Sequence, residues 1–234
     1  MNINPKIVIE GKEYKLPSSF TVDQWIELMQ YDFENPKDWP KILAFLTEED
    51  PEFLLKAGED SLKLTTTVIV YKMNQRKEAK GMKDFNTILF GEFIDLDIWI
   101  AQGIRKNLKS ILNILCPKIK RADEALWVLD QFVNWRNGIF RMYKVLFGID
   151  DRQLDGDGDI DDDDEAYDPM ALARNWYAVI VELANWDVLK IDQITDLPLL
   201  KALNFMALKK QRAMEELAAI KKQHKKYELQ RNRR

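Results

Sequence analysis

The chain opens on two short stretches in which apolar and polar residues alternate. They are residues 7–10, IVIE, and residues 13–16, EYKL, with Gly11 and Lys12 between them. This pattern is typical of two β-strands joined by a tight turn. Because two strands alone are marginally stable in water, we expect this hairpin to pack against the helices that follow it.

Helical signals begin at residue 21. Thr21 and Gln24 form a capping-box pattern, which predicts a helix that runs to about Tyr31. The sequences DWP at 38–40 and DP at 50–51 place an acid and an early proline where helices begin. They predict two more short helices.

A longer segment, residues 61–79, supports two interpretations. A helix over this range places four residues on one face, namely Leu64, Val68, Tyr71 and Gln75. Its centre, TTTVIV, is rich in β-branched residues, which also favour a strand. The pattern favours the helix and leaves the strand open.

The middle of the chain carries three further helical patterns. Residues 85–103 begin with a short extended piece, and Gly91 separates it from a helix. Residues 104–115 predict a helix with an apolar stripe, made of Leu108, Ile111, Leu112 and Leu115. Residues 122–147 predict one long helix, with Gly138 as the candidate position of a bend.

Two helices are expected at the C-terminal end. Residues 169–186 are apolar on most faces, so we expect this helix to be buried on more than one side. From Pro198 onward, a seam of alternating four- and three-residue steps predicts a long terminal helix. The seam consists of Leu199, Leu203, Met206, Lys210, Ala213, Leu217, Ile220, His224 and Tyr227.

This seam is the predicted partner-binding surface. Its apolar members, which we expect to contact a partner helix, are Leu199, Leu203, Met206, Leu217, Ile220 and Tyr227. The alternative is a helix packed on the protein's own body. That alternative accounts for residues 199–208 better than for the charged remainder.

Together the elements predict a mainly α fold. A β-hairpin packs on a multi-helix body in residues 1–149, an acidic flexible linker spans residues 150–168, and a C-terminal helical pair with a long basic terminal helix fills residues 169–234. No internal repeat is evident in the sequence.

The composition fits a folded, soluble protein. Of 234 residues, 46% are hydrophobic, which is enough for one sizeable core or two smaller ones. The longest apolar runs are too short to cross a bilayer, and the first residues lack a secretory pattern. We therefore expect a cytoplasmic protein that makes no membrane contact.

Charge divides the chain more sharply than its net value of −4 suggests. Residues 150–168 hold eleven Asp and Glu against one arginine, whereas residues 209–234 hold ten Lys and Arg against three Glu. The basic end can neutralise phosphates, form a hydrated helix end, or fold back onto the acidic run. The hydrated helix end is the favoured interpretation, since no base-reading or stacking group lies beside the cations, and the fold-back onto the acidic run and nucleic-acid binding are less favoured to a similar degree.

The acidic run, DGDGDIDDDDEAYD at 155–168, partly matches a calcium-binding loop. With Gly158 at the sixth position of such a loop, carboxylates occupy the expected places at Asp155, Asp157, Asp161 and Asp164. Gln153 stands where the first acid is needed, and the bidentate glutamate is missing. We expect a hydrated tether without a metal, and keep a calcium-responsive protein as an alternative.

Catalytic motifs are absent from the sequence. Cys116 is the only cysteine and His224 the only histidine, and each lies in a setting that does not indicate nucleophilic chemistry. Serine elbows, glycine-rich phosphate loops and paired histidines do not occur. We expect neither an enzyme nor a bound cofactor.

Three segments resemble proteins of tailed bacteriophages. KIVIEGKEYKLPSSFTVDQWIEL resembles the hairpin and helix with which phage tail assembly chaperones and related small tail-module proteins begin. DFNTILFGEFIDLDIWI and NWYAVIVELANWDVLKIDQITDLPLLKALNFMALKKQ are similar to segments of helical proteins from the same assembly modules. These segments cover about a third of the chain, and the acidic run is not a shared family feature.

The resemblance implies a non-catalytic helper in the host cytoplasm. Such a chaperone shields helices of the tape-measure protein and helps to recruit tail-tube subunits, so both are expected partners, with self-association as a further one. The alternative class is a structural virion component, such as a neck, adaptor or baseplate protein.

Overall fold

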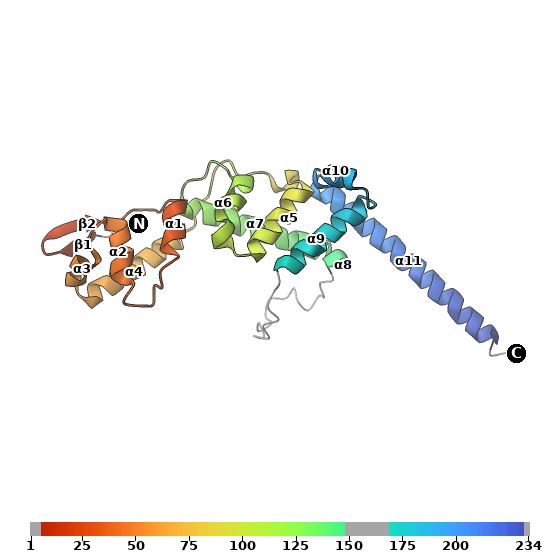
Figure 1. The fold of residues 1–234 in the computed structure, drawn as a ribbon, viewed down its shortest axis with the longest axis horizontal. Helices are drawn as coiled ribbons and strands as arrows, with labels where there is room; N and C mark the ends of the chain where they lie inside the picture. The colour runs from red at the N-terminus through yellow and green to blue at the C-terminus, as the bar shows by residue number, and fades with distance from the viewer. Residues whose placement is uncertain (1–5, 148–168, 232–234) are drawn as a thin grey trace. The chain divides into compact units, whose positions relative to one another are not determined.

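The computed structural model describes residues 6–147 and 169–231, and the side chains of the last helix as far as Lys226. Helices and one two-stranded sheet make up this part of the chain (Figure 1). It divides into two compact units. Unit 1 comprises Met1–Met82 and Ile104–Phe132, and unit 2 comprises Lys83–Gly103 and Val133–Arg234.

This division differs from the expected one, which placed residues 1–149 and 169–234 on either side of a linker. The segment 83–103 belongs with the C-terminal helices because its helix packs against theirs. The acidic run at 150–168 lies outside the described residues.

Unit 1 contains the hairpin and a group of helices. Its elements are β1 (Lys6–Ile9), β2 (Lys12–Lys15), α1 (Val22–Leu28), α2 (Trp39–Thr47), α3 (Pro51–Leu54), the 3-10 turn η1 (Leu55–Ala57), α4 (Glu59–Met73), α6 (Ile104–Leu115) and the first half of α7 (Ala122–Met142). Unit 2 contains η2 (Phe85–Thr87), α5 (Phe90–Ala101), the second half of α7, α8 (Lys144–Phe147), α9 (Pro169–Leu183), η4 (Val188–Lys190), α10 (Ile191–Thr195) and α11 (Leu199–Arg231).

The hairpin is confirmed. Strands β1 and β2 are antiparallel, and the turn between them has positive φ angles at Glu10 (49°) and Gly11 (80°). Two successive positive φ angles match the right-handed twist of the flanking strands. Ile7, Ile9 and Tyr14 are buried, so one face of the hairpin packs on the body of unit 1 as expected.

The capping box of α1 is also confirmed. The Gln24 backbone N–H donates to Thr21 Oγ1 at 3.1 Å, and the Thr21 N–H donates to Gln24 Oε1 at 3.0 Å. These bonds satisfy amides that the helix itself leaves without partners. The helix ends at Leu28, earlier than expected.

Helix α4 resolves the ambiguity in favour of a helix, but this helix ends at Met73, and residues 74–79 are not helical. The hydroxyl groups of Thr65 and Thr67 donate to backbone carbonyls one turn back, at 2.7 and 2.9 Å, which accommodates these β-branched residues in a helix. The face that packs is Leu62, Thr66, Ile69 and Met73. Leu64 and Tyr71, on the face named from the sequence, are exposed.

Helices α6 and α7 follow the sequence pattern closely. The four apolar residues predicted for α6 are its buried residues. Helix α7 runs through Gly138 without interruption and ends at Met142, so the expected single helix over 122–147 is divided into α7 and α8.

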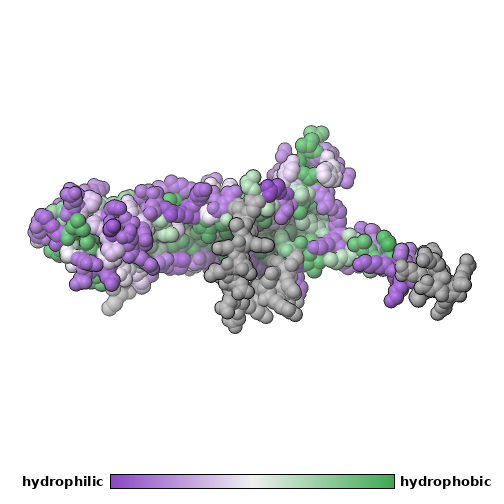
Figure 2. Space-filling model, turned by 60° about the horizontal axis from the view of Figure 1, so that its bottom comes forward, coloured by the Kyte–Doolittle hydropathy of each residue, from purple (hydrophilic) through white to green (hydrophobic). Residues whose placement is uncertain are grey.

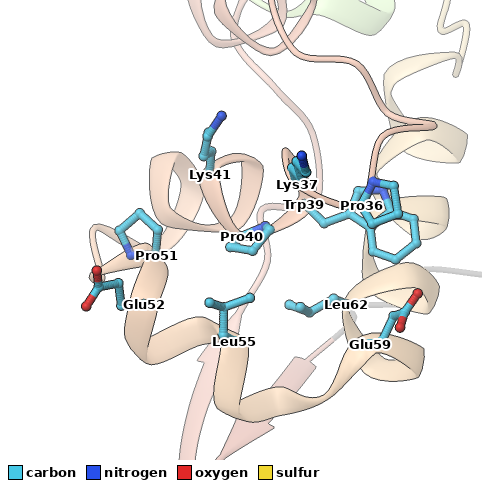
Figure 3. Close-up of a pocket in the computed structure, with 10 residues that line it drawn as sticks. All are labelled: Pro36, Lys37, Trp39, Pro40, Lys41, Pro51, Glu52, Leu55, Glu59 and Leu62. Atoms are coloured by element: carbon cyan, nitrogen blue, oxygen red, sulfur yellow. The ribbon is translucent and has the colours of Figure 1, made fainter.

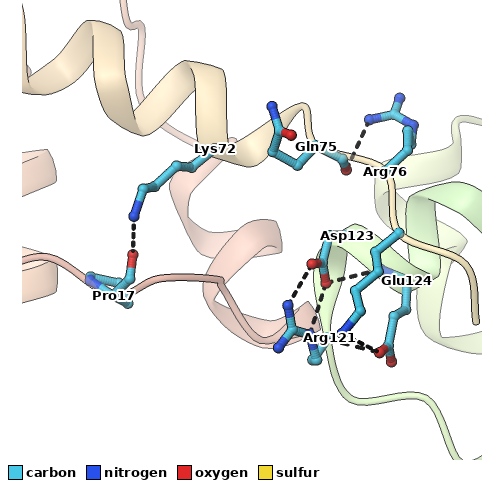
Figure 4. Close-up of polar contacts among 8 residues, drawn as sticks. Pro17, Lys72, Gln75, Arg76, Arg121, Asp123 and Glu124 are labelled. Carbon is cyan, nitrogen blue, oxygen red and sulfur yellow. Dashed lines mark hydrogen bonds and ion pairs between the residues drawn. The ribbon is translucent and has the colours of Figure 1, made fainter. Parts of the chain in front are cut away.

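Polar contacts fix the connections of unit 1 (Figure 4). Lys72 on α4 donates to the Pro17 carbonyl oxygen at 3.0 Å, and burial lowers the pKa of its ammonium group. Arg121 donates to Asp123 in the first turn of α7 at 2.6 Å. The backbone N–H of Lys77 donates to the Asp123 carbonyl at 3.1 Å, which ties the chain after α4 to the start of α7.

Unit 2 has an aromatic core around α5. The Phe93 ring lies edge-on to Trp135, Phe140 and Trp176, with centroids 6.0 to 6.1 Å apart. Such edge-to-face contacts add to the apolar area that the rings bury. Helix α5 therefore brings the second half of α7 and α9 together.

Helix α9 is buried on one side, not on several as expected. Trp176, Ile180 and Ala184 are buried at four-residue steps, while Met170 and Tyr177 are exposed. Among the described residues, this stripe faces α5 and α10.

One local arrangement occurs in both units, contrary to the expectation of no repeat. In unit 1, the Val22 N–H donates to the Lys120 carbonyl and the Ala122 N–H donates to the Phe20 carbonyl, both at 2.9 Å. These reciprocal bonds join the first residues of α1 and α7.

In unit 2, the Phe90 N–H donates to the Leu197 carbonyl at 2.8 Å, and the Leu199 N–H donates to the Ile88 carbonyl at 3.0 Å. They join the first residues of α5 and α11 in the same way. The sequences FTVDQWIEL at 20–28 and ILFGEFIDL at 88–96 share their apolar spacing. We therefore treat α5 as the counterpart of α1, and α11 as the counterpart of α7.

Candidate partner-binding surface

The first part of α11 belongs to the core of unit 2. Leu199, Ala202 and Leu203 are buried, and the Asn204 side-chain oxygen accepts a hydrogen bond from the Tyr143 hydroxyl at 2.7 Å. Leu199 and Leu203 are therefore not available to a partner. This corrects their assignment to the partner-binding surface, because the first part of the seam is buried in the hydrophobic core of unit 2.

A shallow groove continues the seam where α11 leaves the core. Its volume is about 370 Å³, and it lies between α8, α9 and α11. It is lined by Leu146, Val179, Glu182, Leu183, Met206, Lys209, Lys210 and Ala213. Met206, a predicted partner residue, is half-buried in this lining.

Two lysines hold α11 beside the groove. Lys209 Nζ forms an ion pair with Glu182 Oε1 at 2.7 Å, and Lys210 Nζ donates to the backbone carbonyl of Val145. A cation beside the C-terminal end of a helix also interacts favourably with the helix dipole, as Lys210 does at α8. These contacts link α11 to α9 and to α8.

Beyond Lys210, the seam is exposed. Every side chain from residue 211 to residue 226, which we call the distal segment of α11, is exposed. Leu217 and Ile220 lie on the seam with 57% and 60% of their surface accessible. Figure 2 shows hydrophobic residues among hydrophilic ones on α11 next to its grey end. The side chain of Tyr227 lies outside the described residues.

The distal segment holds a helical conformation with little tertiary support. It contains no glycine or proline and is rich in Ala, Leu, Met, Glu and Lys, which are strong helix formers. Helices that do not pack on another surface are marginal in water, even with good propensity. A partner that covers the seam would therefore stabilise this helix as well as bury Leu217 and Ile220.

Unit 1 carries a separate apolar groove (Figure 3). It has a volume of about 560 Å³, and Pro40, Leu55 and Leu62 meet along it. Glu52 and Glu59 lie at its margin on α3 and at the start of α4. Its chemistry suits an apolar side chain, but no feature of the groove indicates which molecule would supply one.

A second cavity of unit 1, of about 480 Å³, lies between α1 and α6. Cys116 lines it but is 1% exposed, and its Sγ lies 3.7 Å from the Lys80 carbonyl oxygen. Burial, and then the nearby Glu124 carboxylate, raise the pKa of the thiol, so it is a poor nucleophile. His224 is exposed on α11 in unit 2.

The remaining sequence candidates concern ions and membranes. The partial calcium loop with Asp155, Asp157, Asp161 and Asp164 lies outside the described residues. Within residues 6–147 and 169–231, no group of three or more His, Cys, Asp or Glu side chains is placed to hold a metal ion. Over the same residues, no helix combines the length and apolar character needed to span a bilayer.

Comparisons of the chain with protein-family models, curated proteins and solved structures find no match. The candidate surface therefore stands on its geometry: a seam that is buried, then grooved, then exposed along one helix.

Proposed function

We propose that this protein is a non-catalytic assembly protein that binds an amphipathic helix of a partner on the distal segment of α11. One observation carries the proposal. The seam that buries Leu199 and Leu203 continues along the same face to Leu217 and Ile220, where it is exposed. Apolar residues at this spacing are the pattern by which helices recognise one another in coiled coils and grooves.

The resemblance to phage tail assembly chaperones supplies the candidate partners. Tape-measure proteins offer long amphipathic helices, and tail-tube subunits are the second expected partner of such a chaperone. In this proposal the protein acts in the host cytoplasm and shields apolar helix faces until the tail assembles. The groove beside Met206 extends the contact surface along α11 toward the core of unit 2.

Co-expression with tagged tape-measure and tail-tube proteins tests the proposal. A chain that ends at Lys210 keeps Leu199 and Leu203 in the core of unit 2, so it removes the distal segment without removing core residues. We expect this chain to recover at least about tenfold less partner, because the apolar contacts at the centre of an interface carry most of its affinity. Undiminished recovery by the shortened chain would contradict the proposal.

A matched pair of double variants separates the seam from the helix. Leu217→Ser with Ile220→Ser should reduce partner recovery to the level of the shortened chain. Ala218→Ser with Ala219→Ser changes the neighbouring, exposed face at no smaller a cost in helix propensity, and should leave recovery unchanged. Mass spectrometry of purified particles distinguishes the structural alternative, because a virion component is present stoichiometrically and a chaperone is absent or scarce.

A further inference from the structure

We infer that the partner helix on the distal segment of α11 is acidic, and that helices of the partner cover Leu217 and Ile220 as unit 2 covers the second half of α7. The inference rests on the proposed function, since it names the chemistry of the partner that α11 binds. It draws on two independent observations, the correspondence of α7 with α11 and the charge of the distal segment.

Helices α7 and α11 begin with the same reciprocal backbone bonds, so positions along them can be compared. Counted from Ala122 in α7 and from Leu199 in α11, Phe140 corresponds to Leu217 and Tyr143 corresponds to Ile220. Leu217 and Ile220 therefore correspond to apolar residues at the end of α7 and just after it, whereas Met214, the third large exposed apolar residue of the distal segment, corresponds to Asn137.

In unit 2, other helices cover those positions of α7. The Phe140 ring lies edge-on to Phe93 of α5, with centroids 6.1 Å apart. Tyr143 is buried and its hydroxyl donates to Asn204 of α11. The second half of α7, which belongs to unit 2, is thus covered at its apolar positions by helices of that unit. The distal segment presents the same positions without cover from the described residues.

The charges of the distal segment select the partner. Lys221 and Lys225 follow Leu217 at four-residue steps, so all three lie on one face of the helix. Trp135 of α7 corresponds to Arg212 in α11. The distal segment carries five Lys and Arg against Glu215 and Glu216, so it is basic, and an acidic helix complements it.

A second copy of this chain fits the surface less well. A parallel pair of distal segments would place Lys221 and Lys225 of the two copies side by side. In an antiparallel pair, Glu215 and Glu216 of each copy would offset only part of the five positive charges of the other, so net repulsion remains. Nucleic acid also fits poorly, because a phosphate backbone would leave Leu217 and Ile220 in water. Residues 211–226 contain no Phe, Tyr or Trp on which bases could stack.

Binding of synthetic peptides to the full chain tests the inference. Two fluorescent peptides form amphipathic helices with leucine at the same seam positions, and they differ only in having glutamate or lysine beside the seam. We expect the glutamate peptide to bind about tenfold more tightly at low salt, since several exposed ion pairs each contribute a little. High salt should shrink the difference, because screening weakens exposed charge pairs.

Charge-reversal variants locate the effect on the helix. Lys221→Glu with Lys225→Glu reverses the face that carries Leu217, and should weaken binding of the glutamate peptide about tenfold. Lys222→Glu with Lys226→Glu makes the same change in net charge one residue further along, away from the seam. This control should change affinity by no more than about twofold.

Equal affinity for both peptides, or equal losses of affinity in the two charge variants, would overturn the inference. Tighter binding of a duplex oligonucleotide than of the glutamate peptide would also overturn it. So would a dimer, detected by light scattering, that Leu217→Ser disrupts. If the two peptides bind equally and Leu217→Ser with Ile220→Ser abolishes both, the proposed function stands and the acidic partner fails. If neither peptide binds and the chain ending at Lys210 still recovers its partner, both fail.

Discussion

Asp97 on α5 is a charged side chain in the core of unit 2. It is 1% exposed and accepts hydrogen bonds from Arg136 Nε at 2.6 Å and Trp176 Nε1 at 2.9 Å. The Arg136 guanidinium also lies over the Phe140 ring, 4.3 Å from its centroid. Burying a carboxylate costs several kcal/mol unless it is paired and hydrogen-bonded, and these partners offset that cost.

Removing the charge of Asp97 should therefore destabilise unit 2. We expect Asp97→Asn to lower the free energy of unfolding by about 3 kcal/mol, because it leaves Arg136 without its ion-pair partner in a mostly buried site. Urea unfolding followed by tryptophan fluorescence measures this change.

The control for this variant is an exposed pair of similar geometry. Arg76 Nε lies 2.6 Å from Asp130 Oδ2, but both side chains are well exposed. Asp130→Asn should cost less than about 1 kcal/mol, since solvent and salt screen exposed pairs. Similar losses at Asp97 and Asp130 would mean that burial does not decide the strength of the first pair.

Two helical glycines differ in what surrounds them. A Cβ atom on Gly91, in the first turn of α5, would lie 3.0 Å from Thr195 Cβ at the end of α10. A Cβ atom on Gly138, within α7, would meet no other atom within 4 Å. Gly91 lets α10 approach α5 closely, while Gly138 has no such role.

Alanine should have opposite effects at these glycines. We expect Gly138→Ala to stabilise the protein by about 0.5–1 kcal/mol, because alanine lowers the entropy of the unfolded chain and favours the helix. We expect Gly91→Ala to destabilise it by about 1 kcal/mol, because the close contact with Thr195 outweighs that gain. Thermal unfolding of the two variants compares their stabilities. Stabilisation by both would show that α10 shifts to admit the Cβ atom at little cost.

Helix α11 should contain two regions of different stability. Its first part is held by the core of unit 2, through Leu199, Ala202 and Leu203, whereas its distal segment is exposed on all sides. Local opening is easiest where few apolar contacts resist it. Among residues 6–147 and 169–226, the distal segment is therefore a part that a partner can order strongly.

Hydrogen exchange followed by mass spectrometry tests this difference. Amides of residues 212–226 should exchange at least about a hundredfold faster than those of residues 203–208 in the protein alone. Addition of the glutamate peptide should slow exchange in residues 212–226 and leave residues 203–208 unchanged. Equal protection of the two regions before addition would show that the distal segment is already covered.

The sequence predictions are accurate where the apolar residues of a helix lie on one face only. The α6 stripe has polar residues on the opposite face, so only one packing arrangement buries its apolar residues. Helix α4 carries apolar residues on two faces, and the face named from Leu64 and Tyr71 is exposed while that of Leu62 and Ile69 packs. The prediction that α9 is buried on several sides is wrong for the same reason, because its apolar residues lie on several faces and only one of these faces packs.

The shared arrangement of the two units was not evident from sequence because its strongest marks are backbone hydrogen bonds. The apolar spacing of residues 20–28 and 88–96 is visible once these bonds align them. The connection before α11 contains α10 and is longer than the connection before α7. The number of residues that separates corresponding positions therefore differs between the two pairs of helices.

Sequence by itself determined the mainly helical class, the hairpin, the capping box of α1 and the extent of α6, because local periodicity and backbone chemistry fix these features. Only the tertiary structure decided which apolar faces are covered, because burial depends on elements distant along the chain. It assigned residues 83–103 to unit 2, and it divided one continuous seam into a buried part at Leu199 and Leu203 and an exposed part at Leu217 and Ile220.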